Sequence, residues 1–191
     1  MEEIVTPRLR LRRARMSDAE DMHLVLSNQQ ATLYWSTPPH SHVEQTRDWL
    51  EKMIAAPPRE SDDFVVEHEG RVIGKAGFWR LPEIGYIFHP DHWGRGLAFE
   101  ALSALIDRAF ARPDIGALVA DVDPANFPSQ RLLEKLGFRE VRRERNTWLI
   151  ADKWHDSIFM ELARPPAPAE APDREFAAFG ENAWRFHHIK L

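Results

Sequence analysis

The segment Glu83-Ile-Gly-Tyr-Ile-Phe-His-Pro-Asp-His-Trp-Gly-Arg-Gly-Leu-Ala-Phe-Glu-Ala-Leu102 decides the fold of this chain. Its first residues predict a strand, its glycines at 94 and 96 predict a turn, and the residues after them open an amphipathic helix. A helix start offers unpaired N–H groups and a positive dipole end, so it can hold a phosphate. Glycines let the backbone approach such a ligand because they carry no Cβ.

The common phosphate loops do not describe this turn. It lacks the Lys-Ser/Thr end of a P-loop and the third glycine of the dinucleotide fingerprint. Taken alone, Trp93-Gly-Arg-Gly-Leu-Ala98 also fits a plain glycine turn between a strand and a helix. A second segment, Asn126-Phe-Pro-Ser-Gln-Arg-Leu-Leu-Glu-Lys-Leu-Gly-Phe138, predicts a helix with Asn126 as its N-cap and Gly137 as its C-terminal stop.

Together the two segments resemble the GCN5-related N-acetyltransferases (the GNAT superfamily), and within it the RimJ/RimL-like branch that acetylates protein N-termini and small amines. Residues 93–98 resemble the loop that binds the coenzyme A pyrophosphate, and residues 126–138 resemble the helix and turn that line the pantetheine arm. The opening Thr6-Pro-Arg-Leu-Arg-Leu-Arg12 and the following Ser17-Asp18 are also similar to this branch. The resemblance spans about residues 5 to 163.

The resemblance implies an acetyl-CoA dependent N-acetyltransferase that modifies a primary amine, on a protein N-terminus or on a small molecule. It also implies a homodimer. No metal is expected, because His89-x-x-His92 and His187-His188 do not supply the three or four ligands that a metal site needs. A backbone N–H within residues 86–88 polarises the thioester carbonyl, and Asn126 bonds the pantetheine amide or caps its helix. Arg95 either adds a charge contact to a phosphate or stays solvated. The residues expected to contact the cofactor are Phe88, Trp93, Gly94, Arg95, Gly96, Leu97, Ala98, Asn126 and Ser129.

Two side chains are the candidates for proton transfer. The amine attacks as a free base, and Glu83 is the first choice to take its proton, although it is also compatible with an exposed strand-edge residue. His89 and His92 are the alternatives that titrate near neutral pH. Many relatives place a tyrosine where Leu133 stands, and the RimJ/RimL-like branch has a serine at the position of Ser129 instead. Ser129 is therefore the candidate general acid, or a first-turn serine that bonds its own helix.

Acceptor recognition is assigned to aromatic residues of an early loop and of one strand. Relatives cover the acceptor with the loop that here contains Tyr34, Trp35, His40 and His42, and Trp79 and Phe78 are candidates for the same cleft. Of these, Tyr34, Trp35 and Trp79 are the expected substrate contacts. For each of them, packing in the core or the loop is the alternative.

The amino-acid composition excludes several classes of site and of protein. Apolar residues make up 43% and charged residues 29% of the chain, which is typical of a globular domain. There is no cysteine, so disulfides, zinc–thiolate sites and an acetyl-cysteine intermediate are excluded, and direct attack in a ternary complex is favoured. A net charge of −5 argues against a nucleic-acid binder. No apolar stretch is long enough for a membrane span and no signal pattern opens the chain, so we expect a cytoplasmic protein.

A basic run near the N-terminus leaves two interpretations open. Its members are Arg8, Arg10, Arg12, Arg13 and Arg15. Three of them alternate with Leu9 and Leu11, as on a half-exposed strand. The run is either a solvated strand face or a site for a polyanion such as RNA.

The order of elements predicts an α+β protein with the GNAT fold. Its sheet is mixed and mostly antiparallel, has about seven strands flanked by helices, and has two central strands, 83–89 and 116–122, that splay apart to admit coenzyme A. The expected strands are 5–13, 64–67, 71–79, 83–89, 117–122, 139–150 and 154–162, and the expected helices are 17–28, 43–55, 95–111 and 126–137. Residues 1–163 form the acetyltransferase domain, 164–174 a Pro/Ala-rich linker, and 175–191 an aromatic tail that is docked or disordered.

A second hypothesis keeps this fold and gives up catalysis. The chain would then be a coenzyme A-binding sensor or interaction protein, because fold alone does not fix function and the usual tyrosine is absent.

Overall fold

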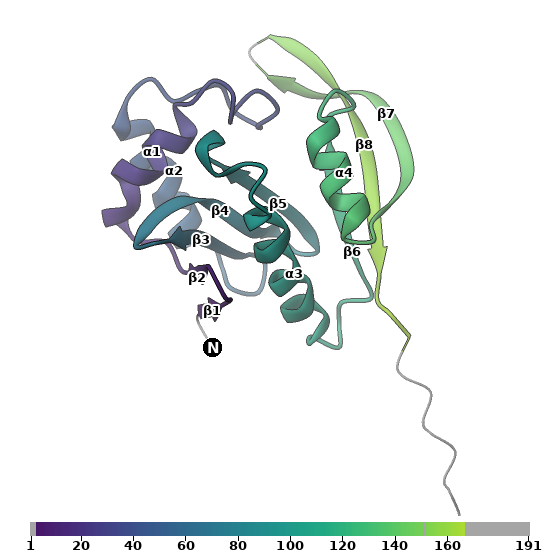
Figure 1. Cartoon of the computed structure of the whole chain (residues 1–191). Helices are drawn as coiled ribbons and strands as arrows, with labels where there is room; N and C mark the ends of the chain where they lie inside the picture. The colour runs from purple at the N-terminus through teal and green to yellow at the C-terminus, as the bar shows by residue number, and fades with distance from the viewer. Residues whose placement is uncertain (1–2, 151, 167–191) are drawn as a thin grey trace, which may run out of the picture.

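The computed structural model describes residues 3–150 and 152–166 (Figure 1). Within those ranges the chain forms one eight-stranded sheet with the order β1-β2-β3-β4-β5-β6-β8-β7. The strands are β1 (Glu3–Val5), β2 (Arg10–Arg12), β3 (Asp62–His68), β4 (Arg71–Arg80), β5 (Glu83–Phe88), β6 (Ala117–Val122), β7 (Arg139–Ile150) and β8 (Lys153–Ala163). The helices are α1 (Ala19–Leu26), α2 (Val43–Ala55), α3 (Leu97–Phe110) and α4 (Phe127–Lys135), with 3-10 turns η1 (Met16–Asp18) and η2 (Pro90–His92).

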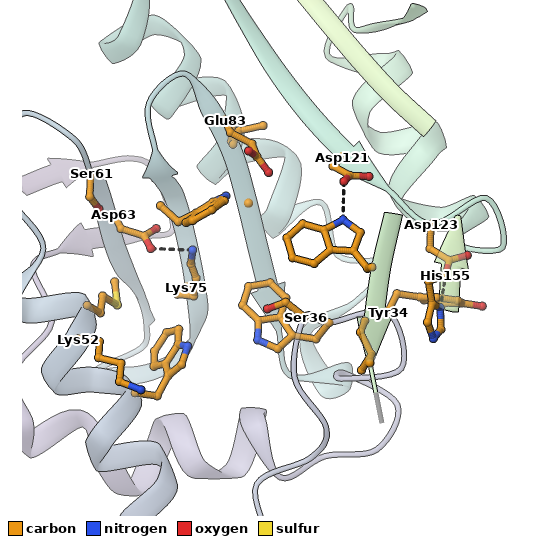
Figure 2. Close-up of a pocket in the computed structure, with 18 of the residues that line it drawn as sticks. Tyr34, Ser36, Lys52, Ser61, Asp63, Lys75, Glu83, Asp121, Asp123 and His155 are labelled. Carbon is orange, nitrogen blue, oxygen red and sulfur yellow. Dashed lines mark hydrogen bonds and ion pairs between the residues drawn. The ribbon is translucent and has the colours of Figure 1, made fainter. Parts of the chain in front are cut away.

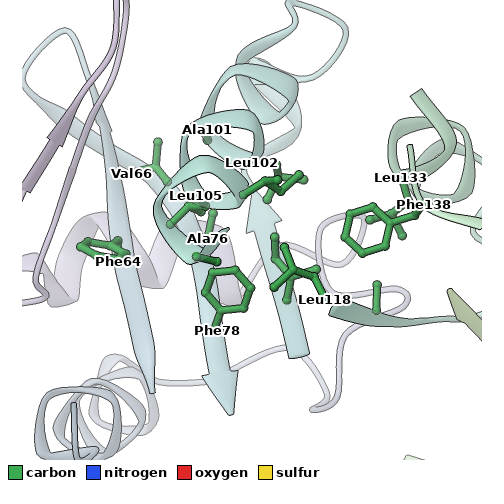
Figure 3. Close-up of a cluster of buried hydrophobic side chains, with 14 of the residues drawn as sticks. Phe64, Val66, Ala76, Phe78, Ala101, Leu102, Leu105, Leu118, Leu133 and Phe138 are labelled. Atoms are coloured by element: carbon green, nitrogen blue, oxygen red, sulfur yellow. The ribbon is translucent and has the colours of Figure 1, made fainter. Parts of the chain in front are cut away.

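The helices cover the two faces of the sheet. Helices α1 and α2 bury Met22, Leu26 and Leu50 against one face, together with Val65 and Ile87 of the sheet. Helix α3 lies on the opposite face, and α4 lies near β6 (Figure 1). Figure 3 shows the second core, where side chains of β3 and β4 meet α3 and where α4 packs near Phe138. Its labelled members are Phe64, Val66, Ala76, Phe78, Ala101, Leu102, Leu105, Leu118, Leu133 and Phe138.

The two central strands separate, as the resemblance implies. β5 and β6 are the only parallel neighbours among the described strands, and their ladder contains a single pair, Glu83 with Val119. Beyond that pair β6 bonds to β8, and β5 bonds to β4 on its other side. Backbone groups along the rest of β5 are therefore not paired with β6, which is the condition for a ligand to enter between the strands.

The expected mixed α+β fold is confirmed, with one difference in strand number. The sequence predicts one strand over 5–13, but the chain turns after Val5, where the Thr6 N–H donates to the Leu9 carbonyl at 2.9 Å. Pro7 fits the second position of such a turn because its φ is fixed. The predicted strand therefore contains the turn and β2 but only the last residue of β1, and the additional strand β1 brings the sheet from about seven strands to eight.

Four of the five arginines of the basic run form ion pairs, and the expected solvated strand face is wrong for Arg12. Arg12 is only 8% exposed, and it donates to both oxygens of Asp18 and to Glu67. Burial of a charged group is tolerated only when it is paired, so this cluster fixes β2 against η1. The other pairs are Arg8 with Glu100 at 2.6 Å, Arg10 with Glu3 at 2.7 Å and Arg13 with Asp62 at 2.6 Å.

The end of the described chain is anchored to the domain. Arg164, the first residue of the predicted linker, donates its backbone N–H to the Gly116 carbonyl at 2.8 Å and its Nη1 to the Phe110 carbonyl at 2.6 Å. The rest of the linker from residue 167 and the aromatic tail lie outside the described residues. No helix in the described part of the chain is long and apolar enough to cross a membrane.

Candidate functional site

The glycine turn lies between β5 and α3, and its shape depends on two left-handed residues. Gly94 has φ 69° and Gly96 has φ 75°, a region that other residues rarely adopt. Gly96 is the N-cap of α3, so the helix begins at Leu97 and the next N–H groups have no partner within the helix. A Cβ on Gly94 would meet nothing within 4 Å, so the turn presents open backbone to an incoming anion.

Side chains around the turn hold it in place. The Trp93 indole donates to the Phe88 carbonyl at 2.9 Å, which folds this ring back onto the end of β5. Arg8 donates from Nη1 to the Arg95 carbonyl at 2.8 Å while it pairs with Glu100. The predicted cofactor residues 93–98 therefore lie together at the start of α3. The Leu97 side chain is buried in the core, so it offers the site only its backbone.

Ser129 lies in the first turn of α4 and bonds across the gap to β5. Its Oγ is 2.5 Å from the Tyr86 hydroxyl, and its N–H donates to the Asn126 side chain at 3.2 Å. Asn126 therefore caps the helix, as expected, while the Ser129 hydroxyl does not bond its own helix. Burial raises the pKa of Tyr86 to about 12, and the hydrogen bond to Ser129 opposes that rise. Tyr86 is a neutral phenol at neutral pH, able to donate a proton to Ser129.

Tyr86 is a residue that sequence reasoning missed. It stands at the centre of β5, where an aromatic residue is a normal strand former, so nothing in the local pattern singles it out. Leu133, where many relatives have a tyrosine, is buried in the core beside Phe138. The only phenol in the described part of the chain that reaches the Ser129 hydroxyl comes from the strand instead of from α4.

An aromatic and acidic cavity of about 450 Å³ lies on the side of the sheet that carries α2 (Figure 2). We call it the acceptor cavity. It brings together Tyr34, Trp35, Trp79 and Glu83, which the sequence assigns to acceptor binding and proton transfer. Its other lining residues are Ser36, Trp49, Lys52, Met53, Ala56, Ser61, Asp63, Lys75, Ile84, Gly85, Asp121, Asp123, Trp148, Ile150, His155 and Asp156.

Glu83 stands at the first position of β5, where the central strands still pair. Burial raises the pKa of its carboxyl above the ordinary value of 4.5, and the nearby charge of Asp121 adds to the rise. A hydrogen bond with Trp79 and the charge of Arg80 oppose it. A carboxylate with a raised pKa is a stronger proton acceptor, which suits a general base.

Two further acidic groups line the cavity beside Glu83, and the sequence analysis did not single them out. Asp121 on β6 accepts a hydrogen bond from the Trp148 indole at 2.6 Å. Asp123, just beyond the end of β6, lies 2.9 Å from Nδ1 of His155 on β8. The alternation Asp121-Val122-Asp123 places both carboxylates on one face of the strand, and this signal is visible in the sequence.

A buried ion pair lines the cavity on the side of Lys52. Lys75 is 2% exposed and its Nζ lies 2.7 Å from Oδ2 of Asp63. Burial raises the pKa of Asp63, whereas the charge of Lys75 opposes that rise. Figure 2 shows this pair on one side of Glu83, with Asp121 and Asp123 on the other side.

Other candidates lie outside the acceptor cavity. Phe78 is fully buried in the core, so the suggestion that it lines the cleft is wrong. His40 bonds Thr46 at 2.9 Å, and His42 is the N-cap of α2. His89 caps η2 beside the glycine turn, and His92 faces Arg95 and the ring of His89.

The two halves of the site therefore meet where β5 and β6 separate. Tyr86 packs against the core of α3 and α4, whereas its neighbour Gly85 lines the acceptor cavity. A ligand that starts at the glycine turn and follows β5 passes Ser129 on one face of the sheet. The acceptor cavity opens on the other face, with Glu83 at its edge.

Comparison with known proteins identifies the family of the chain. Residues 8–139 match the family described as Acetyltransferase (GNAT) domain. The chain is 34% identical over 150 residues to the uncharacterized N-acetyltransferase p20 of Bacillus licheniformis, covering 73% of this chain and 84% of that protein. It is 26% identical over 161 residues to the spermidine N(1)-acetyltransferase of Escherichia coli, covering 80% of this chain and 84% of that one.

Solved structures show the same fold. A GNAT-family acetyltransferase from Bacillus anthracis has a TM-score of 0.75 at 25% identity, covering 84% of this chain and 98% of that chain. A family match over more than half of the chain, a relative above 30% identity and this shared fold lead to one conclusion. The chain belongs to the GNAT acetyltransferases and is an acetyl-CoA dependent N-acetyltransferase.

Proposed function

We propose that this enzyme transfers the acetyl group of acetyl-CoA directly to the primary amine of a small molecule within a ternary complex. The observation that carries the proposal is the position of Glu83 at the last pair between β5 and β6, with the Tyr86–Ser129 pair three residues further along β5, where the two strands have separated. A cavity of about 450 Å³ has the size of a small-molecule site, and it supports a small amine over a protein N-terminus as the acceptor.

The glycine turn fits the pyrophosphate of coenzyme A. Its left-handed glycines leave room for the phosphates, and the first turn of α3 supplies N–H donors and the positive end of its dipole. Arg95, which is exposed beside this turn, supplies a positive charge to the same anion. Backbone groups of β5 that are not paired with β6 face the path of the pantetheine arm.

The proposed reaction moves one proton on each side of the thioester. Glu83 takes the proton of the acceptor amine, directly or through water, as the nitrogen attacks the carbonyl carbon. A backbone N–H within residues 86–88 stabilises the oxyanion. The new C–N bond forms and the C–S bond breaks. Ser129 then donates its hydroxyl proton to the leaving sulfur, and Tyr86 replaces that proton through their 2.5 Å hydrogen bond. The proton held by Glu83 goes to solvent, and solvent returns one to Tyr86, so no net proton is left on the enzyme.

The branch, the assembly and the location are part of the proposal. The N-terminal segment Thr6–Arg12 supports a RimJ/RimL-like enzyme, and the family supports a homodimer in the cytoplasm. Light scattering coupled to gel filtration measures the assembly: the proposal predicts twice the mass of one chain.

The alternative is a coenzyme A-binding sensor on the same fold. The absence of a tyrosine at Leu133 supports it, whereas Tyr86 beside Ser129 supports catalysis. The test is release of free thiol from acetyl-CoA with a panel of small amines and peptides. Acceptor-dependent release is expected for the enzyme. Coenzyme A binding without release for any acceptor would support the sensor.

A further inference from the structure

The acceptor cavity is strongly acidic. Five carboxylates line it, at Asp63, Glu83, Asp121, Asp123 and Asp156, whereas its cationic residues are Lys52, Lys75 and the titratable His155. Because Lys75 is paired with Asp63, its charge is already balanced. The remaining carboxylates outnumber the remaining cations, so the cavity favours a positively charged occupant.

The charges are also separated in space. In Figure 2 the two lysines lie on one side of Glu83, and Asp121 and Asp123 lie on the other. Both aspartates come from β6 or its end, and each accepts or shares a hydrogen bond with a side chain that lines the same cavity, Trp148 or His155. The end of the cavity beyond Glu83 is therefore an acidic wall that is held in a fixed position.

Aromatic rings supply the remaining walls. Tyr34, Trp35, Trp49, Trp79 and Trp148 all line the cavity. Aromatic faces attract ammonium groups, and they also pack against the methylene chain that links two such groups. The cavity therefore suits a flexible aliphatic chain with positively charged ends.

A buried carboxylate oxygen in the wall has no partner. Asp63 is 8% exposed, and its Oδ1 is buried without a hydrogen-bond partner among the described residues. Such a group is costly when it is left unsatisfied, and a ligand N–H donor would satisfy it. This oxygen lies on the Lys75 side of the cavity, across Glu83 from Asp121 and Asp123 (Figure 2), so it offers an acceptor to the part of a ligand nearest Lys75.

We propose that the acceptor cavity binds a small aliphatic diamine in its doubly protonated form. One ammonium first releases a proton to solvent and then reacts at Glu83, which takes the second proton during the attack, while the other ammonium lies against Asp121 and Asp123. This inference rests on the proposed function, since it names the class of acceptor for the same reaction.

Three acceptors of equal chain length test the inference: putrescine, n-butylamine and γ-aminobutyrate. The expected order of kcat/KM is putrescine first, n-butylamine about tenfold lower and γ-aminobutyrate lowest, since one charge contact commonly contributes about a factor of ten. Equal or higher kcat/KM for n-butylamine would overturn the inference. So would a preference for γ-aminobutyrate, whose carboxylate would then lie on Lys52 or on Arg145 of a neighbouring cavity.

Two conservative variants and one control locate the second charge. Asp121→Asn and Asp123→Asn keep an oxygen for their present partners, and each is expected to lower kcat/KM for putrescine about tenfold but for n-butylamine less than about threefold. Asp107→Asn removes one exposed charge on α3, away from the cavity, and is expected to change neither value. Equal losses for both amines in the cavity variants would contradict a contact with the second ammonium.

A binding measurement separates this inference from catalysis. Tetramethylputrescine keeps both positive charges but has no N–H that acetylation can replace. Calorimetry is expected to show saturable binding that weakens about tenfold in Asp123→Asn and also weakens with added salt. If no amine releases thiol while this binding persists, the proposed function fails and the diammonium site stands. Absence of this binding would overturn the site even if monoamines are acetylated.

Discussion

The hydroxyl of Tyr86 lies 2.5 Å from the hydroxyl of Ser129, and this bond joins β5 to α4 beside the separation of β5 and β6. The tyrosine comes from the strand that would carry the thioester, and the serine comes from the first turn of the helix across the gap. In the proposed mechanism, these two neutral hydroxyl groups supply the proton to the leaving thiolate.

Removing either hydroxyl is expected to slow the chemical step. Ser129→Ala is expected to lower kcat about a hundredfold, the usual size of a general-acid contribution. Tyr86→Phe removes one hydrogen bond and is expected to lower kcat about three- to tenfold. The double variant is expected to be no slower than Ser129→Ala, because the two hydroxyls act as one unit.

Single-turnover rates and calorimetric titration with coenzyme A check this relationship. The Kd for coenzyme A is expected to stay within about twofold of wild type, since the losses belong to kcat. Independent, multiplying losses in the double variant would contradict a relay from Tyr86 to Ser129. A parallel loss of coenzyme A affinity would show that the pair only supports the structure.

Protonation of Glu83 is expected to cause the fall of kcat at low pH, which we call the acidic limb of the pH–rate profile. Because burial raises its pKa, the carboxylate is lost at a higher pH than for an ordinary glutamate, and kcat falls as the pH drops through that raised pKa. Asp121→Asn removes a negative charge that raises the pKa of Glu83, so the fall of kcat is expected to move to lower pH. Glu83→Gln is expected to lower kcat about a hundredfold and to abolish the limb.

The measurement is kcat at saturating acceptor as a function of pH for these variants. Glu44→Gln is the matched control, because Glu44 is exposed on α2 and does not line the acceptor cavity. An unchanged acidic limb in Glu83→Gln would assign proton acceptance to another group, with His155 beside Asp123 as the first to examine.

A side chain added to the glycine turn is expected to weaken coenzyme A binding. Gly96→Ala places a Cβ on a residue with φ 75°, and the strain is about 1–3 kcal/mol. The turn is expected to rearrange, which weakens coenzyme A binding by about tenfold or more by misplacing the N–H donors. Calorimetry measures the Kd. Gly116→Ala is the control, because Gly116 has no positive φ and its new Cβ would meet nothing within 4 Å. Equal affinities for both variants would contradict the phosphate role.

Breaking the buried ion pair of Arg12 and Asp18 is expected to lower the stability of the fold. Their side chains are 9% and 5% exposed, so Asp18→Asn leaves a buried guanidinium with Glu67 as its remaining charged partner. The free energy of unfolding is expected to fall by about 3 kcal/mol, as it does when a buried pair is broken. Asp114→Asn, which breaks the exposed pair with Arg112, is expected to cost less than about 1 kcal/mol. Urea unfolding of both variants checks the difference, and similar losses would contradict it.

Local patterns in the sequence are sufficient for most of the fold. Apolar spacing, with Pro57-Pro58 as a stop, predicts α2 with its observed bounds, and the mostly apolar run Ala117–Val122 predicts β6. The turn at Thr6–Leu9 escapes prediction because the alternation of Arg and Leu already begins at Arg8 inside it, although Pro7 and the hydrogen bond between Thr6 and Leu9 mark the turn. Local periodicity therefore predicts elements better than it predicts breaks within them.

Some residues of the candidate site can also be predicted from the sequence, and others cannot. The glycine turn, Glu83 and Ser129 follow from the order of motifs along the chain. Tyr86 and His155 do not, because their roles depend on contacts between distant segments, 43 residues apart for Tyr86 with Ser129 and 32 for His155 with Asp123. The burial of Arg12 is also a tertiary property, which the composition of a basic run does not reveal.

The most direct test of the central claim is release of free thiol from acetyl-CoA by wild type and Glu83→Gln, with the acetylated acceptor identified by mass spectrometry. We expect release that requires an amine, matches the acetylated product one for one, and falls about a hundredfold in Glu83→Gln while coenzyme A still binds. Tight coenzyme A binding without acceptor-dependent release, or release that is unchanged in Glu83→Gln, would contradict the proposed mechanism.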